Sequence, residues 1–428
     1  MSNMNYLLTS ESVTCGHPDK LCDYISDSIL DECLARDKQA RVAIEVFTKG
    51  LAATEHNPPR SVIVIGGEVT MKDDVEIDYE KIARNAALEV GYNSQDFGLD
   101  AGDLESCEVL VLVGRQSDDI SQGVNLGEGL YEQQGAGDQG IMYGFATNES
   151  EHFVDLRGTF MPLPILLSHR ITSKMAEVRK NGEMKWARPD GKSQVTICYS
   201  NQGKPLYVHS IVIAIQHDDL AKEVFQNNIN KEREFIKKEI IEKIINVVVP
   251  AELQNEEMKI IINGTGRFVK GGPEGDAGLT GRKIIVDSYG GIGRHGGGCF
   301  SGKDPSKVDR SGAYAARWAA KHIVASGLSD TCEIQLSYAI GIDKPISINI
   351  DTFGKSKINN KIIKEIVETI FDFTPLKIIE KLNLRNQKYS KTSSGGHFGN
   401  EIFTWEIINS EIIDAINKKA NALKILNN

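Results

Sequence analysis

The chain has 428 residues, of which 40% are hydrophobic and 25% are charged, a composition typical of a globular protein with a sizeable core. Acidic residues outnumber Lys and Arg by 59 to 49, and the net charge of −10 argues against general nucleic-acid binding. No run of about 18 apolar residues is present, so we expect no membrane span.

The N-terminal residues lack a basic region followed by an apolar block, so we expect no signal peptide. Residues 10–36 predict a loop followed by a helix, because Pro18 suits a first helical turn and one apolar stripe follows it. His17 and Asp19 then lie at the open N-terminal end of the helix. Two interpretations stay open: a cap and a dipole partner, or a phosphate donor and a Mg²⁺ ligand.

Three segments alternate or run apolar as β-strands do: 41–48, 61–70 and 106–113. A helix is expected near 78–90, and 51–60, which contain two consecutive prolines, predict an exposed loop. Glu45 and Glu68 lie inside the first two strands. Each carboxylate either faces solvent or points inward as a ligand.

Residues 114–140 are glycine-rich and have little apolar periodicity, which favours a lid or binding loop over 114–134, with a disordered linker as the alternative. The block GAGDQG at 135–140, which contains Asp138, predicts a ligand-facing turn.

In the middle of the chain we expect a helix after Pro164 and a turn at Asp190-Gly191. Lys192 follows at the mouth of a strand over 194–199, where it is either a solvated lysine or an anion ligand. The remaining elements expected by periodicity are strands at 207–216, 258–262, 333–340 and 346–350 and helices at 231–248, 361–372 and 410–425.

The most unusual stretch is 264–310, which holds 14 of the 40 glycines and eight Lys or Arg against five Asp or Glu. Glycines let the backbone approach a ligand closely, so this basic segment predicts a polyanion site, with a flexible surface loop as the alternative. Residues 283–287 read as a strand. Asp304 and Pro305 read as the N-cap and first residue of a helix.

Two familiar motifs inside this stretch fail on inspection. Residues 291–296 fit G-x-G-x-x-G, yet no apolar-faced helix follows them directly. Residues 297–304, GGCFSGKD, fit G-x-x-x-x-G-K, but Asp304 stands where a P-loop needs a Ser or Thr. We therefore keep phosphate binding by backbone and lysine, and reject both motifs.

Strands and helices alternate through three blocks, 1–118, 134–265 and 266–428, without a detectable sequence repeat. The expected fold class is α+β, with mixed sheets and helices packed on one face. The seven cysteines form no C-x-x-C pair, which favours reduced thiols in a cytoplasmic protein and argues against a zinc site.

Three motifs, HPDK at 17–20, GAGDQG at 135–140 and GGGCFSGKDPSKVD at 296–309, resemble those of S-adenosylmethionine synthetases (methionine adenosyltransferases). Further similarity runs through 188–193, 265–268 and 279–287, and the resemblance is collinear from about residue 9 to 405. The resemblance implies three pseudo-symmetric domains, a homodimer with active sites shared between subunits, often paired into a tetramer, and a reaction of ATP with methionine that releases phosphate and pyrophosphate.

The chemistry of that reaction suits these residues. A thioether sulfur carries no proton, so its attack on C5′ of ATP needs no general base. Catalysis rests on aligning sulfur, carbon and leaving oxygen and on neutralising the departing tripolyphosphate. Lysines, arginines, Mg²⁺ and glycine loops provide this, and a catalytic triad is not required.

The resemblance also implies roles for individual residues. His17, Lys192, Lys303 and Asp309 would be catalytic, with Asp19 as a ligand of Mg²⁺ (two per site) and Glu45 as a ligand of K⁺. ATP would be bound by these residues: His17, Asp190, Gly191, Lys192, Arg267, Phe268, Asp276, Arg282, Lys283, Cys299, Lys303 and Ile340. Methionine would be bound by these: Glu68, Gln116, Asp138, Asp276 and Lys307.

The chain departs from the family pattern in two insertions, near 51–60 and 152–161, and in Cys299, which stands where Ala is common. None removes a proposed charged ligand. Two other function classes stay under consideration: a phosphotransferase that uses the GGCFSGK loop, and a nucleotide-sensing subunit that has lost turnover. ADP as the product would favour the first, and ATP binding without turnover the second.

Overall fold

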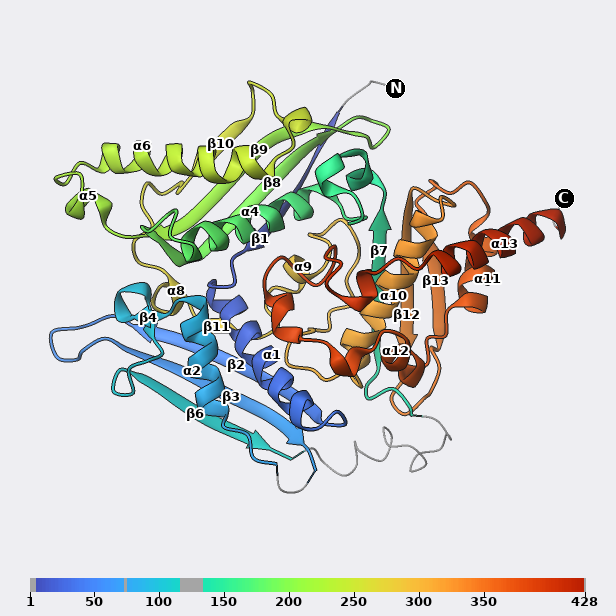
Figure 1. Cartoon of the computed structure of the whole chain (residues 1–428), viewed down its shortest axis with the longest axis horizontal. Helices are drawn as coiled ribbons and strands as arrows, with labels where there is room; N and C mark the ends of the chain where they lie inside the picture. Colours follow the sequence, from blue (N-terminus) through green and yellow to red (C-terminus); the bar gives the residue numbers. More distant parts are fainter. Residues whose placement is uncertain (1–4, 73–74, 116–133, 427–428) are drawn as a thin grey trace.

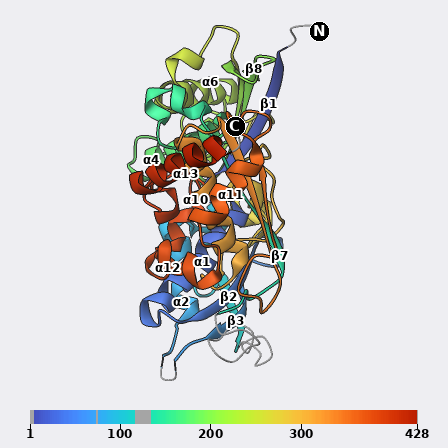
Figure 2. The ribbon, with the colours of Figure 1, turned by 90° about the vertical axis from the view of Figure 1, so that its right-hand side faces the viewer.

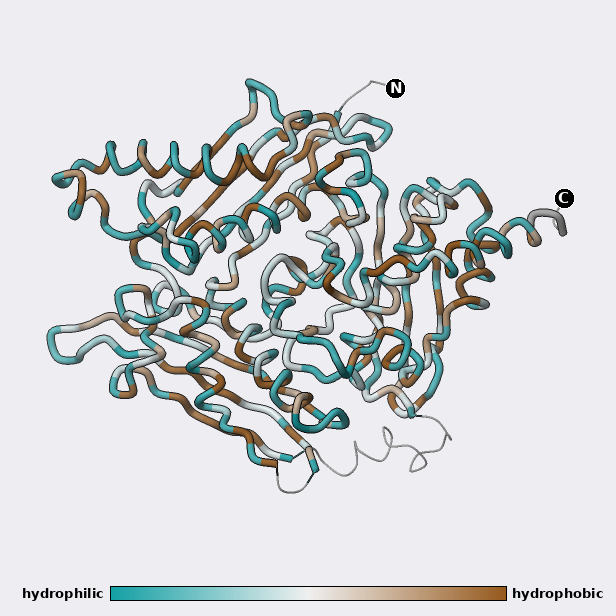
Figure 3. Tube along the Cα trace, in the orientation of Figure 1, coloured by the Kyte–Doolittle hydropathy of each residue, from teal (hydrophilic) through white to brown (hydrophobic). Residues whose placement is uncertain are grey.

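A computed structural model describes residues 5–72, 75–115 and 134–426. Three β-sheets of three or four strands stand side by side, with helices on a common side of them (Figures 1 and 2), and β4 (Asn93–Ser94) and β5 (Leu99–Asp100) form a separate two-stranded sheet. Hydrophobic residues are concentrated along the strands (Figure 3). No helix in the described ranges is both long and apolar enough to cross a membrane.

The chain repeats one order of elements: strand, helix, hairpin, helix, strand. The first unit contains β1 (Tyr6–Val13), α1 (Pro18–Arg36), β2 (Arg41–Leu51), β3 (Arg60–Thr70), α2 (Tyr79–Val90) and β6 (Cys107–Gly114). The second contains β7 (Gly140–Thr147), α4 (Leu163–Lys180), β8 (Ala187–Tyr199), β9 (Pro205–His217), α6 (Ile229–Ile240) and β10 (Lys259–Ile262). The third contains β11 (Gly278–Leu279), α10 (Val308–Ala325), β12 (Thr331–Tyr338), β13 (Ser347–Asp351) and α11 (Asn360–Ile370), with no strand after α11 up to residue 426, where the described part of the chain ends.

The units exchange their first strands in a ring. The sheet orders are β1-β8-β9-β10, β11-β2-β3-β6 and β13-β12-β7, so each hairpin pairs with the first strand of another unit. These three pairings, β1 with β8, β7 with β12 and β11 with β2, are all antiparallel. β6 and β10 return parallel to β3 and β9 after a helix. The fold class expected from the sequence, α+β with mixed sheets, is confirmed.

Alternation along each strand separates a buried face from an outer face. In β2, Val42, Ile44 and Val46 are buried, and they pack against α1, whose apolar stripe is fully buried. Glu45 and Phe47, on the opposite face, are exposed. The helices therefore cover only one side of this sheet and leave its outer side open.

The remaining strands and α-helices lie within or after these units. They are β4 (Asn93–Ser94), β5 (Leu99–Asp100), α5 (Leu220–Glu223), α7 (Asn246–Val248), α8 (Gly272–Gly275), α9 (Ile284–Asp287), α12 (Pro375–Lys381) and α13 (Ser410–Leu426). The helix expected over 231–248 continues from α6 through a π-helical turn at Ile241–Ile245 into α7. The insertion near 152–161 begins with two short 3-10 turns, Glu149–His152 and Val154–Leu156.

Four local expectations were wrong. Residues 283–287 form the helical turn α9, because Lys20 binds Asp287 at its end. α10 begins at Val308 instead of Pro305, because the Asp304 carboxylate accepts N–H groups from Val42 and Ser306. Asp190-Gly191 lies inside β8, at a register irregularity. The segment before α1 is the strand β1 up to Val13, and only 14–17 form a loop.

Candidate active site

The site begins at the N-terminus of α1. His17 caps this helix: its Nδ1 lies 3.2 Å from the backbone nitrogen of Asp19, and Pro18 follows at the first helical position. Burial, with the charges of Lys283 and Lys192, lowers the pKa of His17 to about 3. The ring is therefore neutral at pH 7. Because Nδ1 accepts a hydrogen bond, the proton resides on Nε2, which is left as a donor.

Asp19 lies in the first turn of the same helix and is buried. Lys283 Nζ lies 2.5 Å from its Oδ2, and the backbone N–H of Leu279 donates to its Oδ1 at 3.0 Å. Burial alone would raise the pKa of Asp19, but Lys283 and the Leu279 N–H hold it below its usual value. The carboxylate is thus ionised and already neutralised by one cation.

A second set of predicted residues lies on β8. Asp190 is buried, and its Oδ2 accepts a hydrogen bond from the backbone N–H of Gly272 at 2.9 Å. Burial raises the pKa of Asp190 to about 6, although Lys192 opposes the rise. Lys192 itself is exposed, and its charge also acts on His17. Asp276 is close enough to Asp190 to influence it.

A third set surrounds the loop before α10. Lys303 Nζ lies 2.6 Å from Asp309 Oδ2. A Cβ on Gly298 would lie 2.3 Å from Asp309 Oδ1, so any larger residue there would displace this carboxylate. Cys299 packs on Gly281, and burial raises the pKa of its thiol. Lys307 pairs with the buried Asp304.

Contacts connect these sets. Gly281 precedes Arg282 and Lys283 by one and two residues, and it also touches Cys299. The structure therefore brings His17, Asp19, Lys192, Lys283 and the Lys303 loop to one region, with Lys, Arg and glycine backbone around two carboxylates. Such an arrangement can bind a polyphosphate.

Other predicted residues lie apart from this region or make different contacts. Arg267 forms ion pairs with Glu232 and Asp219, and the backbone N–H of Phe268 donates to His217. Exposed residues are Glu45 and Glu68 on the outer sheet face, Asp138, Asp276, Arg282 and Ile340. Gln116 lies outside the described residues, as does most of the predicted lid.

Metal binding by the protein alone finds no support. Among the residues that the structure describes, no three His, Cys, Asp or Glu side chains come close enough together to hold an ion. The donors present are single carboxylates beside lysines. This suits Mg²⁺ bound through one or two carboxylates, with phosphate and water oxygens supplying the other ligands.

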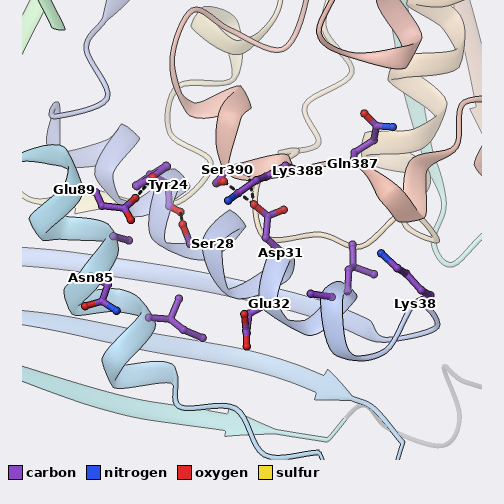
Figure 4. A pocket seen from close by; sticks show the side chains of 14 residues that line it. Tyr24, Ser28, Asp31, Glu32, Lys38, Asn85, Glu89, Gln387, Lys388 and Ser390 are labelled. Carbon is purple, nitrogen blue, oxygen red and sulfur yellow. Dashed lines mark hydrogen bonds between the residues drawn. The ribbon is translucent and has the colours of Figure 1, made fainter. Parts of the chain in front are cut away.

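A cavity of about 400 Å³ lies elsewhere, between α1, α2 and residues 387–390 (Figure 4). Its polar walls carry Tyr24 bonded to Glu89 and Asp31 bonded to Ser390. None of the predicted site residues in the described ranges lines it.

Comparisons with known proteins agree with the motifs. Three family models match in succession: the S-adenosylmethionine synthetase N-terminal domain over 5–118, the central domain over 133–268 and the C-terminal domain over 270–407. The chain belongs to the S-adenosylmethionine synthetase family. The S-adenosylmethionine synthase of Syntrophobacter fumaroxidans is 50% identical over 409 residues, which cover 95% of this chain and 96% of that protein. The S-adenosylmethionine synthase of Mesoplasma florum is 49% identical over 404 residues, covering 94% and 97%.

The family expected from the motifs is thus confirmed, while the individual roles of the site residues stay predictions. Sequence reasoning missed the buried carboxylates beneath the site, Asp23 and Asp27. A signal for both was present: α1 carries an aspartate at every fourth position from 19 to 31. This spacing places polar groups on one face of a helix that also has an apolar stripe.

Proposed function

We propose that this member of the S-adenosylmethionine synthetase family joins ATP and methionine by attack of the methionine sulfur on C5′ of ATP. Tripolyphosphate leaves and is then hydrolysed to phosphate and pyrophosphate before S-adenosylmethionine is released. The observation that carries the proposal is the neutral His17 at a helix N-terminus beside the Asp19–Lys283 pair, with its Nδ1 engaged by the backbone of Asp19.

His17 donates from Nε2 to the phosphate oxygen next to C5′ and stabilises the charge that develops there as the bond breaks. A protonated histidine would add a charge to a site that already holds several lysines, so the low pKa keeps the ring a donor without a net charge. Lys192, Arg282, Lys283 and Lys303 neutralise the tripolyphosphate.

Asp309 orients Lys303 through the 2.6 Å contact. Asp19 would hold Mg²⁺, with Asp309 near it, and the ion would supply charge neutralisation at the phosphates. Lys283, which contacts Asp19 in this structure, would also be within reach of a phosphate bound there. Glu45 offers a carboxylate to K⁺ on the outer sheet face.

The remaining roles follow the family pattern. Phe268 stacks on adenine, and Arg267 contacts the nucleotide, with Asp190, Gly191, Asp276, Cys299 and Ile340 around it. Methionine lies against Glu68, Asp138, Asp276, Lys307 and Gln116. One contact supports a common site for nucleotide and methionine. Ala136, in the turn before Asp138, forms a β-bridge with Ile340.

A second copy of the chain completes the site. The outer faces of the sheets carry exposed apolar side chains, among them Phe47, Leu110, Leu112 and Ile141, and the proposed ligands Glu45 and Glu68 stand among them. Apolar surface of this kind favours association. We propose a homodimer that buries these faces, with dimers pairing into a tetramer. Leu112→Asp should give monomers by sedimentation velocity and abolish turnover; an active monomer would contradict shared sites.

The three matched family models support domains at 1–118, 134–265 and 266–428. All seven cysteines carry free thiols, which supports a cytoplasmic location.

The deciding test is a product analysis. The protein is incubated with ATP, methionine, Mg²⁺ and K⁺, and the products are separated and weighed by mass spectrometry. S-adenosylmethionine with phosphate and pyrophosphate, formed only when methionine is present, is the expected result. ADP would instead indicate a phosphotransferase. The structure argues against that class, because the GGCFSGK loop is not followed directly by a helix, as a P-loop would be. ATP binding without turnover would indicate a sensing subunit.

A further inference from the structure

Four aspartates stand four residues apart along α1, at Asp19, Asp23, Asp27 and Asp31, and so form a row on one face of the helix. Each accepts a hydrogen bond from the backbone of a distant loop. The donors are the N–H groups of Leu279, Gly281, Gly302 and, for the last aspartate, Tyr389 and Ser390. The side chains of one helix thus bind the backbone at four places later in the sequence.

Asp23 holds the segment that carries Lys283. Its Oδ1 accepts the N–H of Gly281 at 2.9 Å, two residues before Lys283. Its Oδ2 lies 3.0 Å from Lys20 Nζ, and Lys20 in turn contacts Asp287 at 2.5 Å, four residues after Lys283. Both ends of this short segment are therefore attached to the first two turns of α1.

Asp27 holds the loop that carries Lys303. Its Oδ1 accepts the N–H of Gly302 at 2.8 Å, and both its oxygens receive the guanidinium of Arg310 at 2.8 Å. Arg310 also donates to the carbonyl of Lys303 at 3.2 Å. The side chains of Asp27 and Arg310 are essentially inaccessible to solvent.

We infer that Asp23 and Asp27 are positioning residues of the proposed reaction, which fix the Lys283 and Lys303 segments relative to each other on a single rigid helix. Neither touches substrate. Two cations that act on one tripolyphosphate must hold a set spacing, and misplacement by about 1 Å costs on the order of 100-fold in rate. The inference rests on the proposed function.

Asp31 provides a matched control from the same row. It is a largely buried carboxylate that accepts two backbone N–H groups and the Ser390 hydroxyl (Figure 4). The segment it holds carries no proposed site residue. Removal of either Asp23 or Asp31 should destabilise the fold, but only the former should disturb the phosphate site.

The test compares Asp23→Ala, Asp23→Asn and Asp31→Ala with the wild-type full-length chain. Each protein hydrolyses added tripolyphosphate, which probes the phosphate site without methionine, and kcat and KM are determined separately beside urea unfolding. We expect kcat of Asp23→Ala to fall about 100-fold. Asp23→Asn keeps an acceptor for Gly281 and neutralises the net charge of the Lys20, Asp23 and Asp287 group, so it should stay within about threefold of wild type, as should Asp31→Ala.

Equal kcat for Asp23→Ala and Asp31→Ala would overturn the inference, as would an Asp23→Asn variant as slow as Asp23→Ala. If Asp23→Ala does not fold, Asp23→Glu takes its place, because it keeps the charge and displaces the acceptor by one methylene. Loss of kcat in Asp23→Glu, together with retention of kcat in Asp23→Asn, would support a positioning role. Equal kcat in these two variants would refute it. Absence of hydrolysis by the wild type would instead reject the proposed function, which separates the two failures.

Discussion

Replacement of Lys303 by alanine should reduce turnover by about three powers of ten. Its ammonium lies 2.6 Å from Asp309, with 22% of the side chain exposed, at the mouth of the phosphate region. A unit charge 4 Å from a phosphate oxygen contributes about 4 kcal/mol at an effective dielectric constant of about 20. Each 1.4 kcal/mol or so corresponds to a tenfold rate, which gives about 1000-fold for charge that develops in the transition state.

The assay measures kcat and KM for S-adenosylmethionine formation, with urea unfolding as the check on folding. Lys270→Ala is the matched control, because Lys270 belongs to the same basic stretch but pairs with Glu274 at the surface, with 75% of its side chain exposed. The control should behave as wild type. A folded Lys303→Ala variant with kcat within tenfold of wild type would refute the assigned role.

Three further outcomes are expected. Burial lowers the pKa of His169 to about 3, so the unfolded chain gains a proton at this residue that the folded protein lacks, and His169 alone should remove up to about 1.4 kcal/mol of unfolding free energy per pH unit below pH 6.5. In His169→Gln that part of the acid loss should vanish; parallel urea-unfolding curves for both proteins from pH 7.5 to 4.5 would contradict this. Glu406→Ala should lower the unfolding free energy by about 3–5 kcal/mol, because it strands two buried cations of α10; a loss under 1 kcal/mol would argue against their pairing. Gly302→Ala should cut kcat severely, since its Cβ would lie 1.9 Å from the carbonyl oxygen of Ile44. Gly182→Ala, also at positive φ but with free space around it, should leave kcat unchanged. Equal kcat values for the two variants would refute this expectation.

Much of the fold was predictable because its strands and helices have strong periodicity. β2, β3, β9, α2 and α13 lie within a few residues of their expected bounds. The family was predictable for a different reason: the motifs combine several glycine and charged positions at fixed spacing, and no single periodicity would have identified them.

The errors arose where distant contacts outweighed local preference. Asp304 has the chemistry of an N-cap, yet β2 and Lys307 occupy its carboxylate, and the helix starts three residues after the predicted Pro305. The apolar run at 284–286 resembles a strand, but Lys20 draws Asp287 into a helical turn. No local pattern reports Val42 as a partner of Asp304 or Lys20 as a partner of Asp287, because each pair is more than 250 residues apart in the chain.

The ring of exchanged strands bears on how the chain folds during synthesis. The sheet β11-β2-β3-β6 is complete only when Gly278 of β11 pairs with Thr48 of β2. During synthesis, β2 therefore lacks this neighbour until some 230 further residues have left the ribosome. In the sheet β1-β8-β9-β10, β1 comes from the start of the chain and pairs with β8 of the second unit. In the third sheet, β7 can pair only after β12 has emerged. Contacts at such long range slow folding and leave strand edges open in the meantime, so the nascent chain is vulnerable to wrong pairing until its third unit arrives.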